Sequence, residues 1–134
     1  MVYLLDTCVI IDLIRGDTNT IEALKSKSPD LVAISTITEF ELRYGLAKTP
    51  NLKTKSKRAV ESLLQEVNLQ NFESKEAKKA AEIRNKMKLL GTPIGPYDVL
   101  IAATALANDL ILVTSNLGEF SRINELKIEN WRDA

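Results

Sequence analysis

Short apolar runs alternate with longer amphipathic stretches along this chain, and this alternation restricts the fold more than any other feature. The apolar runs are VYLLD, LVAIS and LILVT, with NLQNF as a weaker strand candidate and LKIENW as a plausible last strand. A continuous apolar run is typical of a strand that is covered on both faces, as in a parallel sheet between helices. We therefore predict an α/β fold with a central, mostly parallel β-sheet flanked by helices.

Helices are predicted between these strands. A short helix at Val9–Leu13 ends at the break RGDT, and TIEALKSK forms the next helix. Thr36 or Thr38 is expected to cap ITEFELRYGLA, which is followed by KSKRAVESLLQEV. The long segment SKEAKKAAEIRNKMKLLG ends at Gly91, and Pro96 opens the last long helix. No repeat or long linker interrupts this order, so residues 1–134 are expected to form a single domain.

The overall composition suits a protein that stays in water. Of the 134 residues, 45% are hydrophobic, which is enough for one core, but no apolar run approaches the roughly 20 residues that span a bilayer. The only cysteine, Cys8, cannot form an internal disulfide. We expect a soluble, cytoplasmic protein with no membrane partner.

Two residue types that many enzymes need are scarce or missing. The chain has no histidine and one cysteine, which excludes a Ser-His-Asp triad, a Cys-His pair and the usual zinc sites. Hydrolytic chemistry would therefore depend on carboxylates, together with an oxygen-binding cation such as Mg²⁺ or Mn²⁺.

The net charge of zero hides an uneven distribution. Residues 48–90 carry eleven Lys and Arg against five Glu, a net charge of +6, so the rest of the neutral chain carries −6. Basic side chains beside an acidic region fit a protein that attracts a polyanion toward a carboxylate cluster. Two solvated amphipathic helices explain the same charges more simply, so the charge pattern alone favours them and does not establish binding of a polyanion.

Acidic and amide side chains follow the predicted strands. Asp6 follows YLL, and Asn116 follows ILVT by two residues. The carboxyl ends of parallel strands meet at one edge, where ligands usually bind. Asp98 lies in the first turn after Pro96, where the helix dipole alone favours an acid. However, Ile101, Ala102 and Ala105 follow on the same side, so Asp98 begins a buried stripe and can join this edge.

The helix ITEFELRYGLA contains two glutamates with different spacing. Glu39 lies three residues after Thr36 and four before Arg43, so a capping and ion-pair role accounts for it. Glu41 shares a stripe with Ile37 and Tyr44 on the apolar side. Glu41 also has the spacing of a capping box with Thr38, so a structural role for it stays open.

Taken together, four segments resemble PIN-domain proteins of the VapC toxin type. These segments are YLLDTCVIIDLI, ISTITEFELRYG, PIGPYDVLIAATALANDLILVTSNLGEF and LKIENW. The resemblance implies a PIN-like fold and a metal-dependent endoribonuclease that pairs with a VapB-type antitoxin and forms a homodimer. It also implies that Asp6, Glu41 and Asp98 are catalytic and hold Mg²⁺ or Mn²⁺.

The sequence departs from this family pattern at two positions. Cys8 stands where the first motif usually reads Asp-Thr-Asn, so an amide beside Asp6 and Thr7 is lost. Asn116 stands where many relatives carry a fourth acid, and Glu119 is expected to compensate by reaching in from the following turn. We therefore assign Thr7, Asn116 and Glu119 to an auxiliary role. A catalytically impaired PIN-fold module that keeps antitoxin or RNA binding is the alternative function.

The remaining expectations concern RNA binding and structural positions. Five basic residues are expected to hold the RNA backbone: Arg43, Lys53, Lys55, Lys57 and Arg58. Because only 5% of residues are aromatic, base stacking is expected to contribute little. Asp12 and Asp109 are interpreted as surface or turn acids, and the stripe Ala80, Ile83, Met87 and Leu90 as core or interface.

Overall fold

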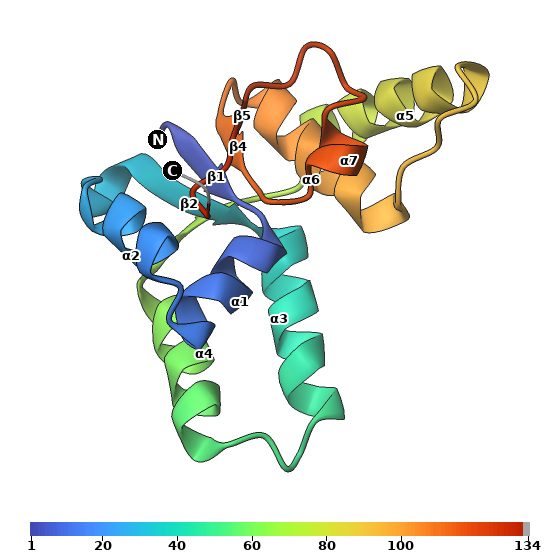
Figure 1. Ribbon diagram of the computed structural model, residues 1–134. Coiled ribbons are helices and arrows are strands. Elements are labelled where there is room, and N and C mark those ends of the chain that lie inside the picture. The colour runs from blue at the N-terminus through green and yellow to red at the C-terminus, as the bar shows by residue number, and fades with distance from the viewer. Residues whose placement is uncertain (133–134) are drawn as a thin grey trace.

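The computed structural model, which describes residues 1–132, contains a five-stranded parallel sheet with the order β3-β2-β1-β4-β5. This confirms the predicted α/β fold. All five predicted strands are present, although each is shorter than its apolar run (Figure 1). They are β1 (Tyr3–Leu5), β2 (Val32–Ser35), β3 (Asn68–Gln70), β4 (Ile111–Val113) and β5 (Ile128–Glu129).

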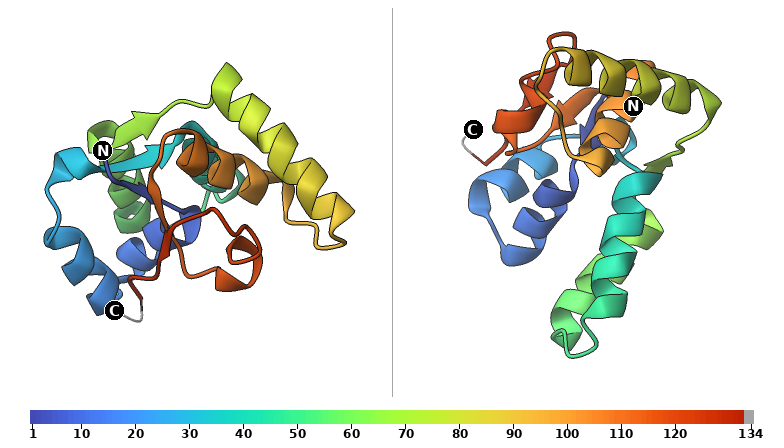
Figure 2. Two further views of the ribbon diagram at one scale, coloured as in Figure 1. Left: turned by 90° about the horizontal axis from the view of Figure 1, so that it is seen from above. Right: turned by 90° about the vertical axis from the view of Figure 1, so that its right-hand side faces the viewer.

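Helices cover both faces of the sheet (Figures 1 and 2). The helices are α1 (Thr7–Arg15), α2 (Thr18–Lys25), α3 (Thr36–Lys48), α4 (Thr54–Glu66), α5 (Ser74–Leu89), α6 (Pro96–Ala107) and α7 (Leu117–Phe120), with a short 3₁₀ turn at Pro29–Leu31. The sequence did not predict α7 or the 3₁₀ turn. A four-residue helix is too short to show a 3.6-residue hydrophobic period.

Adjacent strand residues point to opposite faces of the sheet and enter two separate hydrophobic clusters. Leu4 and Leu112 pack into the cluster that includes α5 and α6, whereas Leu5 and Val113 pack into the cluster under α1 and α4. Burial on both faces explains why the strand sequences are continuously apolar. The stripe on α5 is core at Ala80, Ile83 and Met87, while Leu90 is exposed.

Two helices extend beyond the sheet. Figure 2 shows α3 and α4 projecting side by side from the body of the molecule, with their connection at the far end. Thr36 lies directly after β2, and the 13 residues of α3 span roughly 20 Å to Lys48 at the tip. We call this pair of helices, residues 36–66, the helical arm. One side of α3 therefore lies free of the sheet.

Two expectations about single residues were wrong. The N-cap of α3 is Ser35, whose hydroxyl accepts a hydrogen bond from the Ile37 amide, because α3 begins immediately after β2. Thr36 and Thr38 therefore lie inside the helix. Asp12 is buried rather than a surface acid, because the Arg132 guanidinium pairs with it. Asp109 does lie in a turn, with a φ of 52°.

Within residues 1–132, no helix combines the length and apolar character needed to span a membrane.

Candidate active site

The strand order reverses at β1, which pairs with β2 on one side and with β4 on the other. A crevice outside the carboxyl ends of the strands forms at such a reversal and commonly binds ligands. Asp6 follows β1 directly, and Thr114 follows β4. The helices α1, α3 and α6 begin near this edge (Figure 1). The other candidate acids are Glu41 on α3, Asp98 on α6 and Glu119 on α7.

Asp6 is the most deeply buried candidate, with 4% of its surface exposed. Its Oδ1 accepts the Thr7 amide at 2.8 Å, and its Oδ2 accepts the Thr114 hydroxyl at 2.8 Å. Burial raises the pKa of Asp6 above its usual range, and the charge of Glu119 acts in the same direction. The hydrogen bonds oppose this shift by stabilising the carboxylate. The hydrogen bonds therefore fix the Asp6 carboxylate in position. Burial of its negative charge costs free energy, and a bound cation would offset this cost.

The Thr7 hydroxyl connects α1 to α3. It donates to Glu41 Oε1 at 2.8 Å, and it lies 3.2 Å from the Thr38 hydroxyl oxygen. Burial raises the pKa of Glu41, with a further contribution from the charge of Asp6, while the Thr7 bond lowers it. Glu41 thus faces the acidic edge, and Glu39 instead pairs with Arg43 at 2.9 Å. The ion pair predicted for Glu39 is confirmed. Its predicted capping role with Thr36 is wrong, because Ser35 is the N-cap of α3.

Asp98 and Glu119 form a carboxyl–carboxylate pair. Burial is the largest cause that raises the pKa of Asp98 to about 8, followed by the hydrogen bond with Glu119. The negative charges of Asp6, Glu119 and Glu41 add to this shift. The pKa of Glu119 is lowered, first by the hydrogen bond from Asp98. The two groups therefore share one proton near neutral pH.

Gly95 and Asn116 complete the surroundings of this pair. The Gly95 amide donates to Glu119 Oε1 at 3.3 Å, and a β-carbon at Gly95 would lie 3.4 Å from Asp98 Oδ2. The Asn116 amide nitrogen lies 3.4 Å from both Asp98 Oδ2 and Glu119 Oε2. Glu119 thus reaches back to Asp98 from α7, and Asn116 lies between the two acids and the end of β4.

Cys8 lies in the same region. Its thiol donates to Asp6 Oδ2 at 3.4 Å and lies 3.5 Å from the Thr114 hydroxyl. The Cys8 thiol therefore donates to Asp6 from the position where an asparagine side chain is usual. A thiol is a weaker hydrogen-bond donor than the amide of asparagine.

The structure brings the predicted acids to one edge of the sheet, but their side chains are not close enough together to form a compact cluster. The charges of Asp6, Glu41 and Asp98 affect one another, and Glu119 affects Asp6 and Asp98. Within residues 1–132, no three acidic or cysteine side chains form a ready metal cluster. The donors are nevertheless oxygen atoms, and their repulsion favours protonation or a bound cation. This donor set fits Mg²⁺ or Mn²⁺ rather than a soft metal.

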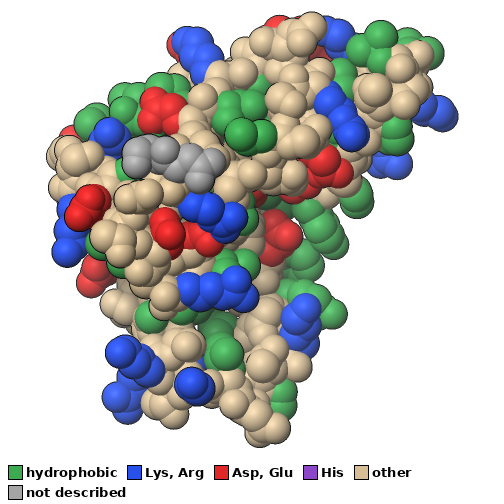
Figure 3. Space-filling model, in the orientation of Figure 1, with side chains coloured by type: hydrophobic (Ala, Val, Ile, Leu, Met, Phe, Trp, Pro, Cys, Tyr) green, Lys and Arg blue, Asp and Glu red, His purple; other side chains and the backbone are tan. Residues whose placement is uncertain are grey.

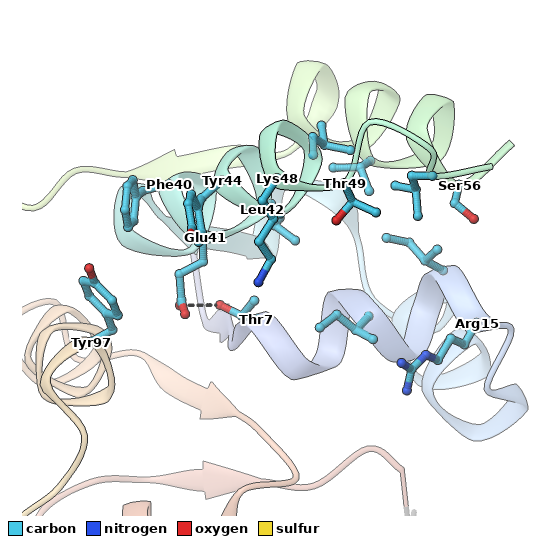
Figure 4. Close-up of a pocket in the computed structure, with 16 residues that line it drawn as sticks. Thr7, Arg15, Phe40, Glu41, Leu42, Tyr44, Lys48, Thr49, Ser56 and Tyr97 are labelled. Atoms are coloured by element: carbon cyan, nitrogen blue, oxygen red, sulfur yellow. Dashed lines mark hydrogen bonds between the residues drawn. The ribbon is translucent and has the colours of Figure 1, made fainter. Parts of the chain in front are cut away.

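A groove of about 940 Å³ runs from the acidic edge between α1, α3 and α4 (Figure 4). Thr7 and Glu41 lie toward one end and Ser56 toward the other (Figure 4), and Leu52 and Val60 also line the groove. Tyr44, which was expected on the buried side of α3, is 57% exposed along this groove. The expectation about Tyr44 was wrong because the helical arm leaves the sheet, so no layer covers this side of α3.

The basic side chains are arranged along the helical arm. Figure 3 shows Lys and Arg side chains around the lower part of the molecule, below a group of acidic side chains. Lys53, Lys55, Lys57 and Arg58 are exposed near the tip of the arm, away from the acids. Arg15 and Lys48 line the groove. Arg15 could not be selected from the sequence, because a basic residue in the last turn of a helix is common.

Comparison with known proteins agrees with this architecture. A family model described as PIN domain matches residues 3–126. The tRNA(fMet)-specific endonuclease VapC of Salmonella typhimurium is 33% identical over 129 residues, which cover 96% of this chain and 97% of that protein. A structure of VapBC-1 from nontypeable Haemophilus influenzae matches with a TM-score of 0.85 and 33% identity, covering 98% of both chains.

A second solved structure shows the same likeness. VapBC2 from Rickettsia felis, bound to a DNA fragment from their promoter, matches with a TM-score of 0.84 and 32% identity over 98% of this chain and 99% of that chain. The fold and the acidic edge define a PIN-type domain. The chain belongs to the PIN-domain family and, within it, to the VapC-type proteins.

Proposed function

We propose that this protein is a Mg²⁺- or Mn²⁺-dependent endoribonuclease that acts as the toxin of a VapBC-type pair. The carrying observation is the group of mutually repelling carboxylates at the reversal of the strand order, where burial and neighbouring charges raise the pKa of Asp98 to about 8. The nuclease names of the relatives, including the tRNA(fMet)-specific endonuclease of Salmonella typhimurium, support the same reaction class.

Asp6, Glu41 and Asp98 would hold the cation, with Asn116 and Glu119 beside them. A bound Mg²⁺ or Mn²⁺ supplies a water of lowered pKa and stabilises negative charge on the phosphate oxygens. The hydroxyls of Thr114 and Thr7 orient the Asp6 and Glu41 carboxylates through bonds of 2.8 Å. These bonds keep the acids in place when the RNA phosphate approaches.

The basic groups would hold the RNA backbone. Arg15 and Lys48 line the groove beside the acids, and both can attract phosphates by releasing counterions. Lys53, Lys55, Lys57 and Arg58 extend the positive charge toward the tip of the arm. Arg43 contributes less, because its guanidinium is paired with Glu39.

The test is cleavage of cellular RNA by the purified protein with Mg²⁺, Mn²⁺ or EDTA. We expect discrete fragments that EDTA abolishes, and a loss of more than about 100-fold for Asp98→Asn and Glu41→Gln, since 100-fold corresponds to about 2.7 kcal/mol in the barrier. Glu39→Gln is the matched control on the same helix and should cleave normally. RNA binding without cleavage by wild-type protein would instead indicate the catalytically impaired binding module.

The groove also supports a protein partner. The relatives of known structure from Haemophilus influenzae and Rickettsia felis are VapBC pairs. Ile11, Ile14 and Leu52 give this groove an apolar lining next to Glu41. We infer that an antitoxin segment lies along it and covers the acids with a basic side chain.

A purified toxin–antitoxin complex tests this partner. We expect the complex to cleave RNA much more slowly than the free toxin, and Ile14→Glu to weaken the complex because a charge enters the apolar lining. A complex as active as the free protein would contradict this arrangement. The homodimer expected from the family resemblance stays a prediction.

A further inference from the structure

Three aromatic side chains gather at the end of the groove that holds Glu41. The rings of Phe40 and Tyr44 are stacked, with centroids 6.2 Å apart and an interplanar angle of 13°. Tyr97 approaches Phe40 from α6, with centroids 5.6 Å apart. Figure 4 shows Tyr97 facing the two α3 rings, with Glu41 pointing down between them and Thr7. We call Phe40, Tyr44 and Tyr97 the aromatic platform.

The platform is unusual because it is exposed. Phe40, Tyr44 and Tyr97 are 49%, 57% and 47% exposed, whereas Phe120 and Trp131 are buried in the core. The chain has one Trp, three Tyr and three Phe, so nearly half of its aromatic residues lie at this one surface. Aromatic rings contribute most to folding when they are buried, so folding alone does not explain the platform.

The platform adjoins the acids along the sequence as well as in space. Phe40 directly precedes Glu41, and Tyr97 directly precedes Asp98. All three rings line the same groove as Glu41 and Thr7. A nucleotide whose phosphate lies at the acidic edge therefore has a ring surface within reach of its base.

The charges around the rings suit RNA. The Lys48 ammonium lies 5.2 Å from the centroid of Tyr44, and Arg15 lines the same groove. Stacked aromatic rings beside positive groups are the combination that binds single-stranded nucleic acid, because every base offers a π face and every linkage a phosphate. A duplex keeps its bases stacked internally and cannot use such rings.

We propose that Phe40, Tyr44 and Tyr97 form a stacking subsite for an unpaired nucleobase next to the scissile phosphate. This proposal rests on the proposed nuclease function and adds a base-binding subsite to it. It also revises the expectation that stacking contributes little, because composition counts aromatic residues but not their grouping.

Binding in EDTA tests the subsite without cleavage. Fluorescence anisotropy of an unstructured RNA oligonucleotide, the same RNA with abasic positions, and an RNA duplex would be measured on the full-length protein. We expect Tyr44→Ala and Tyr97→Ala each to bind single-stranded RNA about tenfold more weakly, in line with one stacked base. Tyr44→Phe and Tyr97→Phe should bind normally, because the ring is kept. Leu89→Ala, on the exposed side of α5, is the control.

The abasic oligonucleotide keeps the test independent of variant folding. Wild-type protein should bind it about tenfold more weakly than the intact strand and should bind the duplex no better. Equal binding of intact and abasic RNA, or unchanged binding by both alanine variants, would overturn the subsite. Alanine variants that lose a second copy of the chain or the antitoxin, but keep RNA affinity, would assign the rings to a protein interface instead. If wild-type protein shows the stacking pattern but never cleaves with Mg²⁺ or Mn²⁺, the nuclease function fails while the subsite stands.

Discussion

At the scale of single residues, hydroxyl groups hold the acids of the candidate site. The Thr114 hydroxyl donates to the buried Asp6 carboxylate at 2.8 Å and accepts a hydrogen bond from the backbone amide of Asn116 at 3.0 Å. It therefore links the ends of β1 and β4 at the point where their carboxyl ends meet. Such a contact does not touch the substrate, but it determines where the carboxylate points.

Thr114→Val should weaken cation binding and cleavage without unfolding the protein. Valine matches threonine in shape but removes the donor to Asp6, and loss of an orienting bond typically costs about 10- to 100-fold in metal affinity or activity. Titration with Mn²⁺ by calorimetry and the Mg²⁺ dependence of cleavage would measure the loss. Thr104→Val is a matched control, since Thr104 is equally buried but donates to Leu100 within α6. Equal effects of the two substitutions would contradict the role of Thr114.

The raised pKa of Asp98 predicts a pH dependence of stability in EDTA. Its usual pKa of 3.8 applies to the unfolded chain, and its pKa in the folded protein is about 8. Between these values the folded protein binds more protons than the unfolded chain, so the free energy of unfolding falls as pH rises from about 4 to about 8. The raised pKa values of Asp6 and Glu41 act in the same direction.

Asp98→Asn should therefore flatten this profile and exceed wild-type stability near pH 8. Urea unfolding in EDTA at several pH values from 5 to 8 would measure it, with Asp109→Asn as the control in an exposed turn. Added Mg²⁺ should reverse the order by stabilising only the wild type, because a ligand of the folded state stabilises it. Parallel profiles for wild type and Asp98→Asn would show that folding does not raise the pKa of Asp98.

At the scale of elements, α5 and α6 are joined by a polar network as well as by the core. Glu76 is 1% exposed, and its Oε2 accepts the Asn108 amide at 2.9 Å. Its Oε1 accepts the Glu73 backbone amide at 2.9 Å and caps α5. Asn108 also donates to the Thr104 carbonyl oxygen at 2.8 Å. The carboxylate thus ties the start of α5 to the end of α6.

Asn108→Ala should destabilise the fold by about 2 kcal/mol, because it removes a hydrogen bond from a buried carboxylate. Urea unfolding would show the loss as a lower midpoint with an unchanged slope. Glu82→Gln serves as the control, since it removes only an exposed ion pair with Lys79 and should change stability by less than about 0.5 kcal/mol. A loss for Asn108→Ala no larger than this would mean that water replaces the amide at Glu76.

The sequence predicts elements better than it predicts contacts between them. Strands such as LVAIS are recognisable because burial on both faces removes polar residues. Gly91, with a φ of 72° just after α5, shows equally well where that helix ends. In contrast, the cap at Ser35 and the exposure of Tyr44 depend on where β2 ends and on how the helical arm leaves the sheet. Neither property has a local hydrophobic period.

The candidate site divides in the same way. Asp6 and Asn116 could be predicted because both follow strands in sequence, and parallel strands end at one edge. The pairing of Asp98 with Glu119 joins α6 to α7, and the approach of Tyr97 to Phe40 joins α6 to α3. Such tertiary contacts between distant segments leave no spacing in the sequence from which they can be predicted.

At the scale of the whole molecule, one ion pair joins the last described residue to α1. Arg132 Nη2 lies 2.7 Å from Asp12 Oδ1, and its Nε lies 3.2 Å from Asp12 Oδ2. The backbone carbonyl oxygen of Arg132 also accepts the Asn19 side-chain amide at 2.9 Å. These bonds hold the segment after β5 against α1 and α2. They lie beside Trp131, which is buried in the same cluster as Val9 and Ile10.

Arg132→Gln should lower the melting temperature by about 3 to 5 °C, because it leaves the buried Asp12 carboxylate without its bidentate partner. The double variant with Asp12→Asn and Arg132→Gln should lose less melting temperature than the two single variants lose together. The reason is that the double variant buries no unpaired charge. Calorimetry of the four proteins would measure this coupling. Lys127→Gln, which removes only the exposed pair with Asp109, should change the melting temperature by no more than about 1 °C. Additive losses would mean that Arg132 acts on stability through its packing near Trp131, and that Asp12 is hydrated once the guanidinium is gone.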